Sequence, residues 1–234
     1  MLIVCHRNAD PDALGSAYGL KKLISESYPL ASRIEIIAED VNEVSGRMME
    51  AYPDITVQDD VISEPDAFIL VDVNNVEHVG KFSEKIRKSK APVIILDHHV
   101  PKASTNEEVA IMLIDEDSSS TAEIVSSIYE STGRKPSSVG ATILLIGIVY
   151  DSKRFSTIKR DAFHAADFLI DAGADYESVL SVLRHPIERS EKIARLKAAQ
   201  RTKMMEIDGW IIVSSTVSSF EASACRALID LGAD

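Results

Sequence analysis

Residues 2–12 read LIVCHRNADPD, an apolar run followed at once by histidine and aspartate side chains. The four residues LIVC predict a short, fully buried strand of the kind found in parallel sheets. Asp10, Pro11 and Asp12 predict the start of a helix, because Asp is a good N-cap and Pro is favoured in the first helical turn. This stretch therefore predicts a strand that leads through polar side chains into a helix.

The same succession of strand and helix repeats further along the chain. Short apolar runs predict strands at residues 2–5, 34–38, 67–71, 92–96 and 109–114, and helical patterns lie between or after them at 13–26, 41–51, 77–89 and 120–131. Residues 139–150 are apolar almost throughout and contain two glycines, which favours a buried helix. This alternation predicts an α/β fold with a doubly wound, mainly parallel sheet flanked by helices.

The C-terminal part of the chain has a different pattern. Two helical segments split by Gly173 fill residues 161–183, and Pro186 then introduces a long charged helix from about residue 187 to Met205, which we interpret as a connector. Asp208 and Gly209 predict a turn, followed by a strand at 210–214 and a helix at 220–231. A strand and a helix cannot bury a core alone. Either they pack on the first domain, or they begin a truncated second α/β domain; we predict domains at 1–185 and 208–234 with a connector at 186–207.

Composition and charge exclude several classes of protein. The chain has 234 residues, 45% of them hydrophobic, and its two cysteines lack the spacing of a disulfide framework or a cysteine zinc site. No apolar run approaches the roughly 20 residues needed to cross a bilayer, so we expect a soluble, cytoplasmic protein with no membrane partner. A net charge of −12 disfavours non-specific binding of long nucleic acid. Short anionic ligands remain open, because divalent cations reverse the field of an acidic site.

Metal-ligand side chains follow the ends of the predicted strands. Ligands of an open parallel sheet bind beyond the carboxyl ends of its strands, so these side chains are expected at one edge. Oxygen and imidazole donors without thiolates suit Mn²⁺, Mg²⁺, Co²⁺ or Zn²⁺, and this many suit two ions about 3.5–4 Å apart. The candidates are His6, Asp10, Asp12, Asp72, Asp97, His98, His99 and Asp151.

Each candidate also has a purely structural interpretation. Taken alone, Asp10 and Asp12 fit a capped helix start better than a ligand pair, and Asp72 fits a turn. Asp151 could be the polar end of an apolar helix, and the stretch at 97–99 could be a surface loop. Four such coincidences on one sheet edge are improbable, so the metal site is the preferred interpretation. Cys5 is interpreted as an inert core thiol.

A phosphate role is suggested by four neighbouring residues. Gly15 and Ser16 fall in the first turns of the helix after Asp12, where free N–H groups favour an anion, although close packing of small residues is an equally good explanation. Lys153 and Arg154 follow Asp151 and could attract a substrate phosphate, or belong to a solvated loop.

These motifs together resemble the DHH phosphoesterase superfamily, in its RecJ-like and nanoRNase-oligoribonuclease branch. The resemblance rests on residues 6–12 with Gly15-Ser16, on Asp72, on Asp97-His98-His99 and on Asp151 with Phe155, and covers roughly residues 1–185. Ser152 stands where the family usually has threonine. Residues 210–234 look similar to the opening strand and helix of the family's second, DHHA1-type domain, in which substrates are selected.

The resemblance implies two divalent cations, Mn²⁺ first, with Mg²⁺ or Co²⁺ as alternatives. It implies that His6, Asp10 and Asp72 hold one ion, and that the other is held by Asp12, Asp72, His98 and Asp151, with Asp72 bridging. Asp97 would then orient an imidazole, and His99 would contact the substrate phosphate.

The activity implied is hydrolysis of phosphate esters in short oligonucleotides or nucleotides, by water activated between two metals. Two other functions stay open: a manganese pyrophosphatase, which needs a basic pocket that no cluster near the C-terminus supplies, and a nucleotide-binding module that has lost turnover. A homodimer is also left open.

Overall fold

The computed structural model describes residues 1–30, 33–60, 64–100, 109–157, 159, 161–184 and 187–234. Pro186, expected to introduce the charged helix, lies outside these ranges. The chain divides into two compact units, Met1–Leu183 and Arg184–Asp234. Each unit is described by itself.

Unit 1 is built on a six-stranded sheet in which every pairing is parallel. Its strands are β1 (Leu2–Cys5), β2 (Glu35–Ile37), β3 (Val57–Gln58), β4 (Phe68–Val71), β5 (Val93–Asp97) and β6 (Val109–Ile114), in the order β3-β2-β1-β4-β5-β6. The α/β prediction is confirmed, although the two-residue β3 was not expected. The strand order reverses beside β1, so the crevice in which such sheets bind ligands lies between the ends of β1 and β4.

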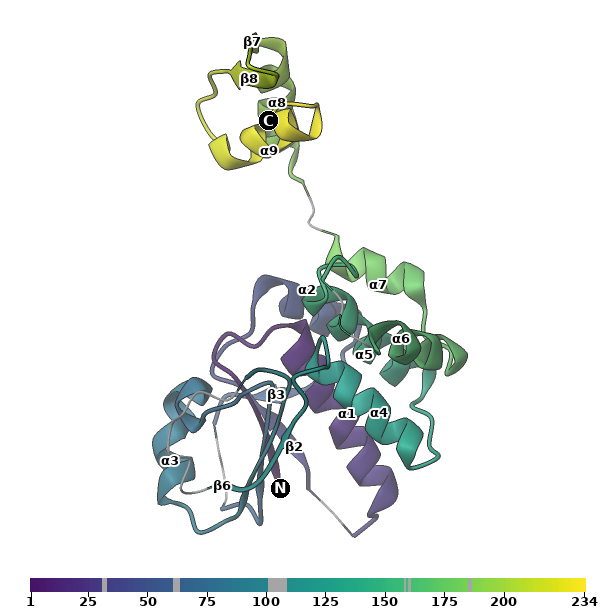
Figure 1. The fold of residues 1–234 in the computed structure, drawn as a ribbon. Coiled ribbons are helices and arrows are strands. Elements are labelled where there is room, and N and C mark those ends of the chain that lie inside the picture. The colour runs from purple at the N-terminus through teal and green to yellow at the C-terminus, as the bar shows by residue number, and fades with distance from the viewer. Residues whose placement is uncertain (31–32, 61–63, 101–108, 158, 160, 185–186) are drawn as a thin grey trace. The chain divides into compact units, whose positions relative to one another are not determined.

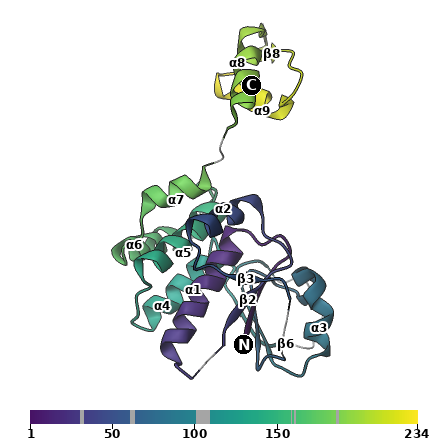
Figure 2. The same cartoon turned by 180° about the vertical axis from the view of Figure 1, so that it is seen from behind.

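Helices cover both faces of the sheet (Figures 1 and 2). One core packs buried side chains of α1, α4 and α5 against one face of the sheet, and a second core joins the other face to η1 and α3. The helices of unit 1 are α1 (Pro11–Ser27), α2 (Glu43–Ala51), the 3₁₀ helix η1 (Val76–Phe82), α3 (Ser83–Lys88), α4 (Thr121–Ser131), α5 (Ser138–Asp151), α6 (Ala162–Asp171) and α7 (Tyr176–Leu183).

The helix expected at 77–89 is in fact two helices. Gly80 has a φ of 62° and interrupts the helical backbone between the first turns of η1 and α3. An added Cβ at Gly80 would also collide with the carboxylate of Glu39. The break follows from the positive φ at this position, a conformation that glycine adopts at little cost.

The expected buried helix is α5, whose residues from Gly140 to Val149 are all buried. Of its two glycines, Gly147 is the one that packs closely against other helices. At Gly147 an added Cβ would lie 3.1 Å from the Cα of Asp12 and 3.0 Å from the Cβ of Ala122. The lack of a side chain there lets α1 and α4 approach α5 closely.

Unit 2 contains α8 (Arg189–Gln200), β7 (Lys203–Ile207), β8 (Trp210–Ser214) and α9 (Glu221–Asp230). The predicted helix as far as Met205 was wrong, because β7 pairs antiparallel with β8. Both turn residues have positive φ, 51° at Asp208 and 85° at Gly209. An Asp-Gly pair in this conformation favours a two-residue hairpin, so the flanking segments form strands.

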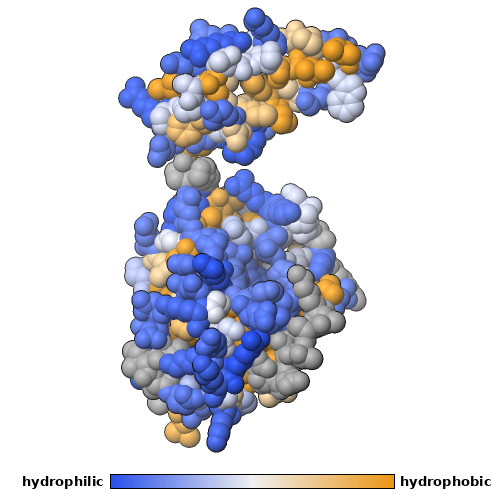
Figure 3. Space-filling view, turned by 90° about the vertical axis from the view of Figure 1, so that its left-hand side faces the viewer, coloured by the Kyte–Doolittle hydropathy of each residue, from blue (hydrophilic) through white to orange (hydrophobic). Residues whose placement is uncertain are grey.

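The helix α8 packs on α9 rather than serving as a bare connector. Arg195 Nε donates to Ser223 Oγ at 2.6 Å, and Arg195 also pairs with Glu191 at 3.1 Å. Figure 3 shows apolar side chains gathered on the surface of unit 2, where Met204 is 73% exposed and Trp210 62% exposed. Whether unit 2 is the start of a larger domain stays a prediction.

Among the helices of the described residues, none combines the length and the apolar character needed to cross a membrane.

Candidate metal centre

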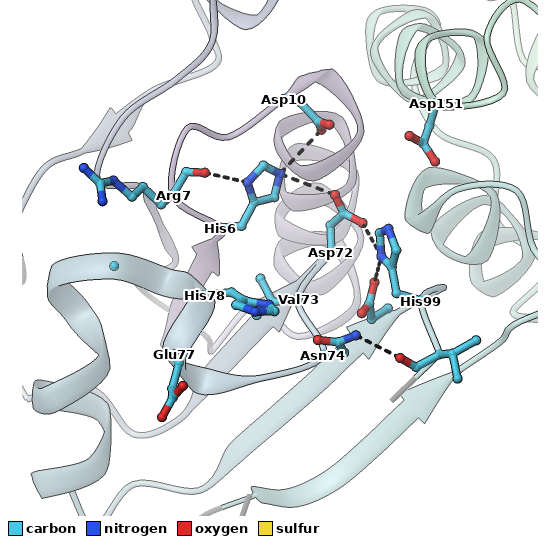
Figure 4. Close-up of a pocket in the computed structure, with 13 residues that line it drawn as sticks. His6, Arg7, Asp10, Asp72, Val73, Asn74, Glu77, His78, His99 and Asp151 are labelled. Carbon is cyan, nitrogen blue, oxygen red and sulfur yellow. Dashed lines mark hydrogen bonds and ion pairs between the residues drawn. The ribbon is translucent and has the colours of Figure 1, made fainter. Parts of the chain in front are cut away.

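The structure brings eight predicted side chains to one edge of the sheet. They follow β1, β4 and β5 or lie at the ends of two helices: Asp10 is the N-cap of α1, and Asp151 is the last residue of α5. A cavity of about 760 Å³ opens over most of them (Figure 4). The eight residues are His6, Asp10, Asp12, Asp72, Asp97, His98, His99 and Asp151.

We call His6 and Asp10 the outer cluster. His6 Nε2 lies 3.7 Å from Asp10 Oδ1, and the two side chains are 23% and 22% exposed. The other ring nitrogen, Nδ1, lies 2.8 Å from the carbonyl oxygen of Arg7, which assigns its proton to that bond. Asp10 Oδ1 also accepts from the backbone N–H groups of Asp12 and Ala13. Its capping role and its contact with His6 therefore coexist.

We call Asp12, His98 and Asp151 the inner cluster. His98 Nε2 lies 4.0 Å from Asp12 Oδ2 and 3.3 Å from Asp151 Oδ2. The His98 side chain is 8% exposed and Asp12 is completely buried. Neither ring nitrogen of His98 has a hydrogen-bond partner among the described residues. A buried imidazole nitrogen without a partner that faces carboxylate oxygens is costly unless another group binds there.

Asp72 lies between the two clusters. Its Oδ2 is 3.5 Å from His6 Nε2, and its Oδ1 is 3.5 Å from His98 Nε2. The residue has a φ of 59°, in the left-handed region that is unfavourable for most non-glycine residues. The two oxygens of one carboxylate thus face two separate groups of possible ligands.

Asp97 is fully buried and organises the loop that carries both histidines. Its Oδ1 accepts from the backbone N–H of His98 at 2.8 Å and lies 2.9 Å from His99 Nδ1. Asp97 raises the pKa of His99, against the lowering effect of its partial burial. His99 is 56% exposed and lines the cavity.

The concentration of carboxylates shifts the pKa values of the ligand side chains. Burial raises the pKa of Asp151 to about 6, and the charges of Asp72 and Asp10 add to the shift. Burial and the same two carboxylates also raise the pKa of Asp12. Burial lowers the pKa of His98, so its ring is neutral at pH 7 and able to bind a metal. For His6, contacts with Asp10 and Asp72 outweigh burial and raise the pKa to about 10.

These residues fit divalent cations. Three groups of side chains each offer ligand atoms that lie within 4.8 Å of one another: His6-Asp10-Asp72, Asp12-His98-Asp151 and Asp72-Asp97-His98-His99. Carboxylate and imidazole donors suit Mn²⁺, Mg²⁺ or Co²⁺. A cation would also compensate the repulsion that raises the pKa values of Asp12 and Asp151, and would give the buried His98 Nε2 a partner.

The four candidates for phosphate binding do not join this site. Gly15 packs against α5, where an added Cβ would lie 2.9 Å from the Ile143 carbonyl oxygen, and Ser16 is fully buried. Arg154 donates to the Leu183 carbonyl at 3.4 Å, and neither it nor Lys153 lines the cavity. The packing interpretation describes Gly15, and the phosphate role of these four residues stays a prediction.

Sequence reasoning missed the contribution of α4. The backbone N–H of Thr121 donates to Asp12 Oδ2 at 2.7 Å, and that of Ala122 donates to Asp12 Oδ1 at 2.8 Å. The Thr121 hydroxyl donates to Asp72 Oδ1 at 3.0 Å. The sequence indicated a helix at 120–131, and only the fold shows that the free N–H groups at its start hold a distant carboxylate.

Comparison with known proteins agrees with these observations. Residues 1–148 match the model of the DHH family, N-terminal domain, so Asp151 lies just past the matched region. An uncharacterized protein of Methanocaldococcus jannaschii is 30% identical, over 100% of this chain and 70% of its own length. Cyclic-di-AMP phosphodiesterase GdpP of Geobacillus thermodenitrificans is 28% identical, over 84% of this chain and 31% of its own.

Two further proteins are similar. Bifunctional oligoribonuclease and PAP phosphatase NrnA of Bacillus subtilis is 23% identical over 95% of this chain and 65% of its own length. A crystal structure of an exopolyphosphatase-related protein from Bacteroides fragilis has a TM-score of 0.71 at 21% identity, covering 86% of this chain and 61% of that one. This chain is thus shorter than each of them. The family match spans most of the chain, and the fold agrees with it: the chain belongs to the DHH family of phosphoesterases.

Proposed function

We propose that this chain hydrolyses phosphodiester or phosphomonoester bonds of short oligonucleotides or nucleotides with two divalent cations, Mn²⁺ first. The observation that carries the proposal is the position of Asp72, whose two oxygens face His6 on one side and His98 on the other. A carboxylate in this position is suited to bridge two ions. The names of GdpP and NrnA, a cyclic-dinucleotide phosphodiesterase and an oligoribonuclease with PAP phosphatase activity, support the substrate class.

In this proposal His6, Asp10 and Asp72 hold one ion, and Asp12, Asp72, His98 and Asp151 hold the other. Bound ions would supply an activated water and neutralise phosphate charge. The charge of the proposed ligands supports a pair of ions, because the four carboxylates of Asp10, Asp12, Asp72 and Asp151 balance the charge of two dications.

In this proposal the imidazole of His99 binds the substrate phosphate. Asp97 occupies its Nδ1, so the opposite nitrogen, Nε2, is the one available to a ligand. The raised pKa of His99 favours the charged imidazole, which donates to an anionic oxygen. Asp97 is a positioning residue here, because it holds both the ring and the backbone of the loop.

The test is hydrolysis of the dinucleotide pApA, adenosine 3′,5′-bisphosphate and pyrophosphate in Mn²⁺, by the unaltered chain and by Asp10→Asn and Asp151→Asn. The proposal expects turnover of the nucleotides, strongly reduced in both variants. Asp54→Asn, which alters an exposed carboxylate away from the cavity, serves as the control. Rapid turnover of pyrophosphate alone would indicate a pyrophosphatase instead. Mn²⁺ binding without any turnover would favour a binding module.

A further inference from the structure

Residues 98–100, the segment that carries His99, extend past the end of the sheet. Beyond β5 they make no backbone-to-backbone hydrogen bond with any residue that the structure describes, and the His99 side chain is 56% exposed. Neither the neighbouring strands nor packing therefore fixes this segment. The ladder on each side of β5 ends with one backbone hydrogen bond: Asp72 N–H to the Leu96 carbonyl at 2.9 Å toward β4, and Asp115 N–H to the Asp97 carbonyl at 3.1 Å toward β6.

Asn74 holds this segment from the side of η1. Its Nδ2 donates to the carbonyl of Val100, one residue past His99, at 3.1 Å (Figure 4). Among the described residues, no other hydrogen bond joins residues 98–100 to the segment between β4 and η1. Asn74 is 8% exposed, and it lines the cavity. Because water competes little for a buried amide, this bond can fix the backbone at Val100.

His99 thus lies between two hydrogen-bonded points. Before it, Asp97 Oδ1 accepts from the backbone N–H of His98 at 2.8 Å and lies 2.9 Å from His99 Nδ1. After it, Asn74 holds the carbonyl of Val100. Asp97 therefore sets the orientation of the ring, and Asn74 sets the course of the backbone that carries the ring.

Asn74 also belongs to the segment that carries Asp72, two residues before it. His99 Nδ1 lies 3.7 Å from Asp72 Oδ1, so the imidazole and this carboxylate are close neighbours. The bond from Asn74 to Val100 joins the two segments on which they lie. Groups of a reactive site need to be held within about 0.5 Å of their productive geometry. A bond that spans the two segments can supply this precision.

We propose that Asn74 is a positioning residue, which holds the His99 imidazole at the place relative to Asp72 that the substrate phosphate requires. The inference rests on the proposed function, in which His99 binds that phosphate. In this role Asn74 holds no ion, and its loss acts through His99.

The kinetic test measures kcat/KM for bis-p-nitrophenyl phosphate in Mn²⁺. Asn74→Leu keeps the size of the side chain and removes the donor. We expect kcat/KM to fall by about tenfold, near the upper end for one neutral hydrogen bond, while two Mn²⁺ ions are retained. Asn74→Asp should lose at least as much, because a carboxylate would then face the Val100 carbonyl.

Asn75→Asp is the matched control. It adds the same charge one residue further along the chain, and Asp keeps the N-cap contact that Asn75 makes with the Glu77 N–H. Asn75 does not line the cavity. We expect its kcat/KM to stay within about twofold of that of the unaltered chain, a smaller change than the loss of a hydrogen bond.

A double-mutant cycle decides whether Asn74 acts through His99. Asn74→Leu is combined with His99→Gln, and we expect kcat/KM of the double variant to equal that of His99→Gln alone. A further loss of about tenfold in the double variant would show that Asn74 acts elsewhere and would overturn the inference. Loss of Mn²⁺ from Asn74→Leu, or an equal fall of kcat/KM in Asn75→Asp, would also overturn it.

A measurement without turnover separates this inference from the proposed function. In ¹H–¹⁵N spectra of the metal-free chain, the signal of the His99 ring is identified by its absence in His99→Gln. We expect Asn74→Leu to shift or broaden this signal and Asn75→Asp to leave it in place. An unchanged signal in Asn74→Leu would overturn the inference. Failure of Asp10→Asn and Asp151→Asn to reduce hydrolysis would instead overturn the proposed function.

Discussion

The outer and inner clusters offer the same kinds of metal-ligand atoms, carboxylate oxygens and imidazole nitrogens, in different surroundings. His6 and Asp10 are about one quarter exposed, and Asp10 is fixed mainly by its role as a helix N-cap. Asp12 and His98 are buried, and Asp12 is held through both oxygens by the start of α4. The difference teaches that a buried ligand needs its own supporting contacts, whereas solvent supports part of an exposed one. We therefore expect an ion at the inner cluster to be held more firmly.

Asp72→Ala would remove the residue that both clusters share. We expect both ions to be lost and hydrolysis of bis-p-nitrophenyl phosphate to fall by more than about 100-fold, beyond the loss typical of residues that only support a ligand. Metal content by mass spectrometry and the rate are measured on the same sample, with Asp54→Ala as control. Retention of two ions would show that Asp72 is not the bridge.

Asp10→Asn would weaken the outer cluster alone. Asn is as good an N-cap as Asp, so the cap is kept, while the metal content falls from two ions towards one and the rate falls by about 10- to 100-fold. Asp10→Ala removes the cap as well and costs about 1 kcal/mol of stability. If Asp10→Asn kept both ions and full activity, Asp10 would be a cap only.

The metal-free protein should lose stability as the pH rises from 5 to 8. In the folded state the pKa values of Asp151 and His6 are raised to about 6 and about 10, above 3.8 and 6.5. Their contribution to stability is therefore fully present below the unfolded pKa of each group and is lost as the pH rises through the folded one. Mn²⁺ replaces these protons, so it should raise the melting temperature more at pH 8 than at pH 5.

Asp151→Asn tests the origin of this pH dependence, because it removes one of the two side chains whose pKa values are raised. Calorimetric melting of the metal-free variant should depend less on pH than that of the unaltered chain. An equal dependence would assign the effect to other residues.

Thr121→Val should have the smallest effect. The hydroxyl that donates to Asp72 Oδ1 is lost while the size of the side chain is kept. We expect Mn²⁺ affinity to fall by about tenfold, the lower end for groups that orient a metal ligand, and Thr121→Ser to restore most of it. A loss of stability in Thr121→Val without a change in affinity would mean that Thr121 only supports the fold.

The fold and the meeting of the ligand candidates could be predicted for a simple reason. Parallel strands end at the same edge of the sheet, so side chains after β1, β4 and β5 must converge whatever the intervening loops do. The assignment of each ligand to an ion stays a prediction.

Other features depend on contacts between distant segments. Nothing near Thr121 in the chain indicates that it bonds to Asp72, and nothing near Gly80 indicates the carboxylate of Glu39 beside it. The sequence left open whether Arg154 contacts a substrate phosphate or belongs to a solvated loop, and nothing in it indicated the three successive residues with positive φ, from Lys153 to Phe155, that turn the chain there. The hairpin at Asp208-Gly209 was different, since its turn signal is local and outweighs the helical pattern before it.

The proposed ligands come from segments that are far apart in the chain and that meet only when β1, β4, β5 and α5 are all in place. An unfolded chain cannot form this arrangement, so on the proposed assignment the ions bind the native state and add to its stability in proportion to the logarithm of their concentration. Manganese would then stabilise a fold that depends on long-range contacts. Its uptake during refolding would report the time at which the strands and α5 have reached their native positions.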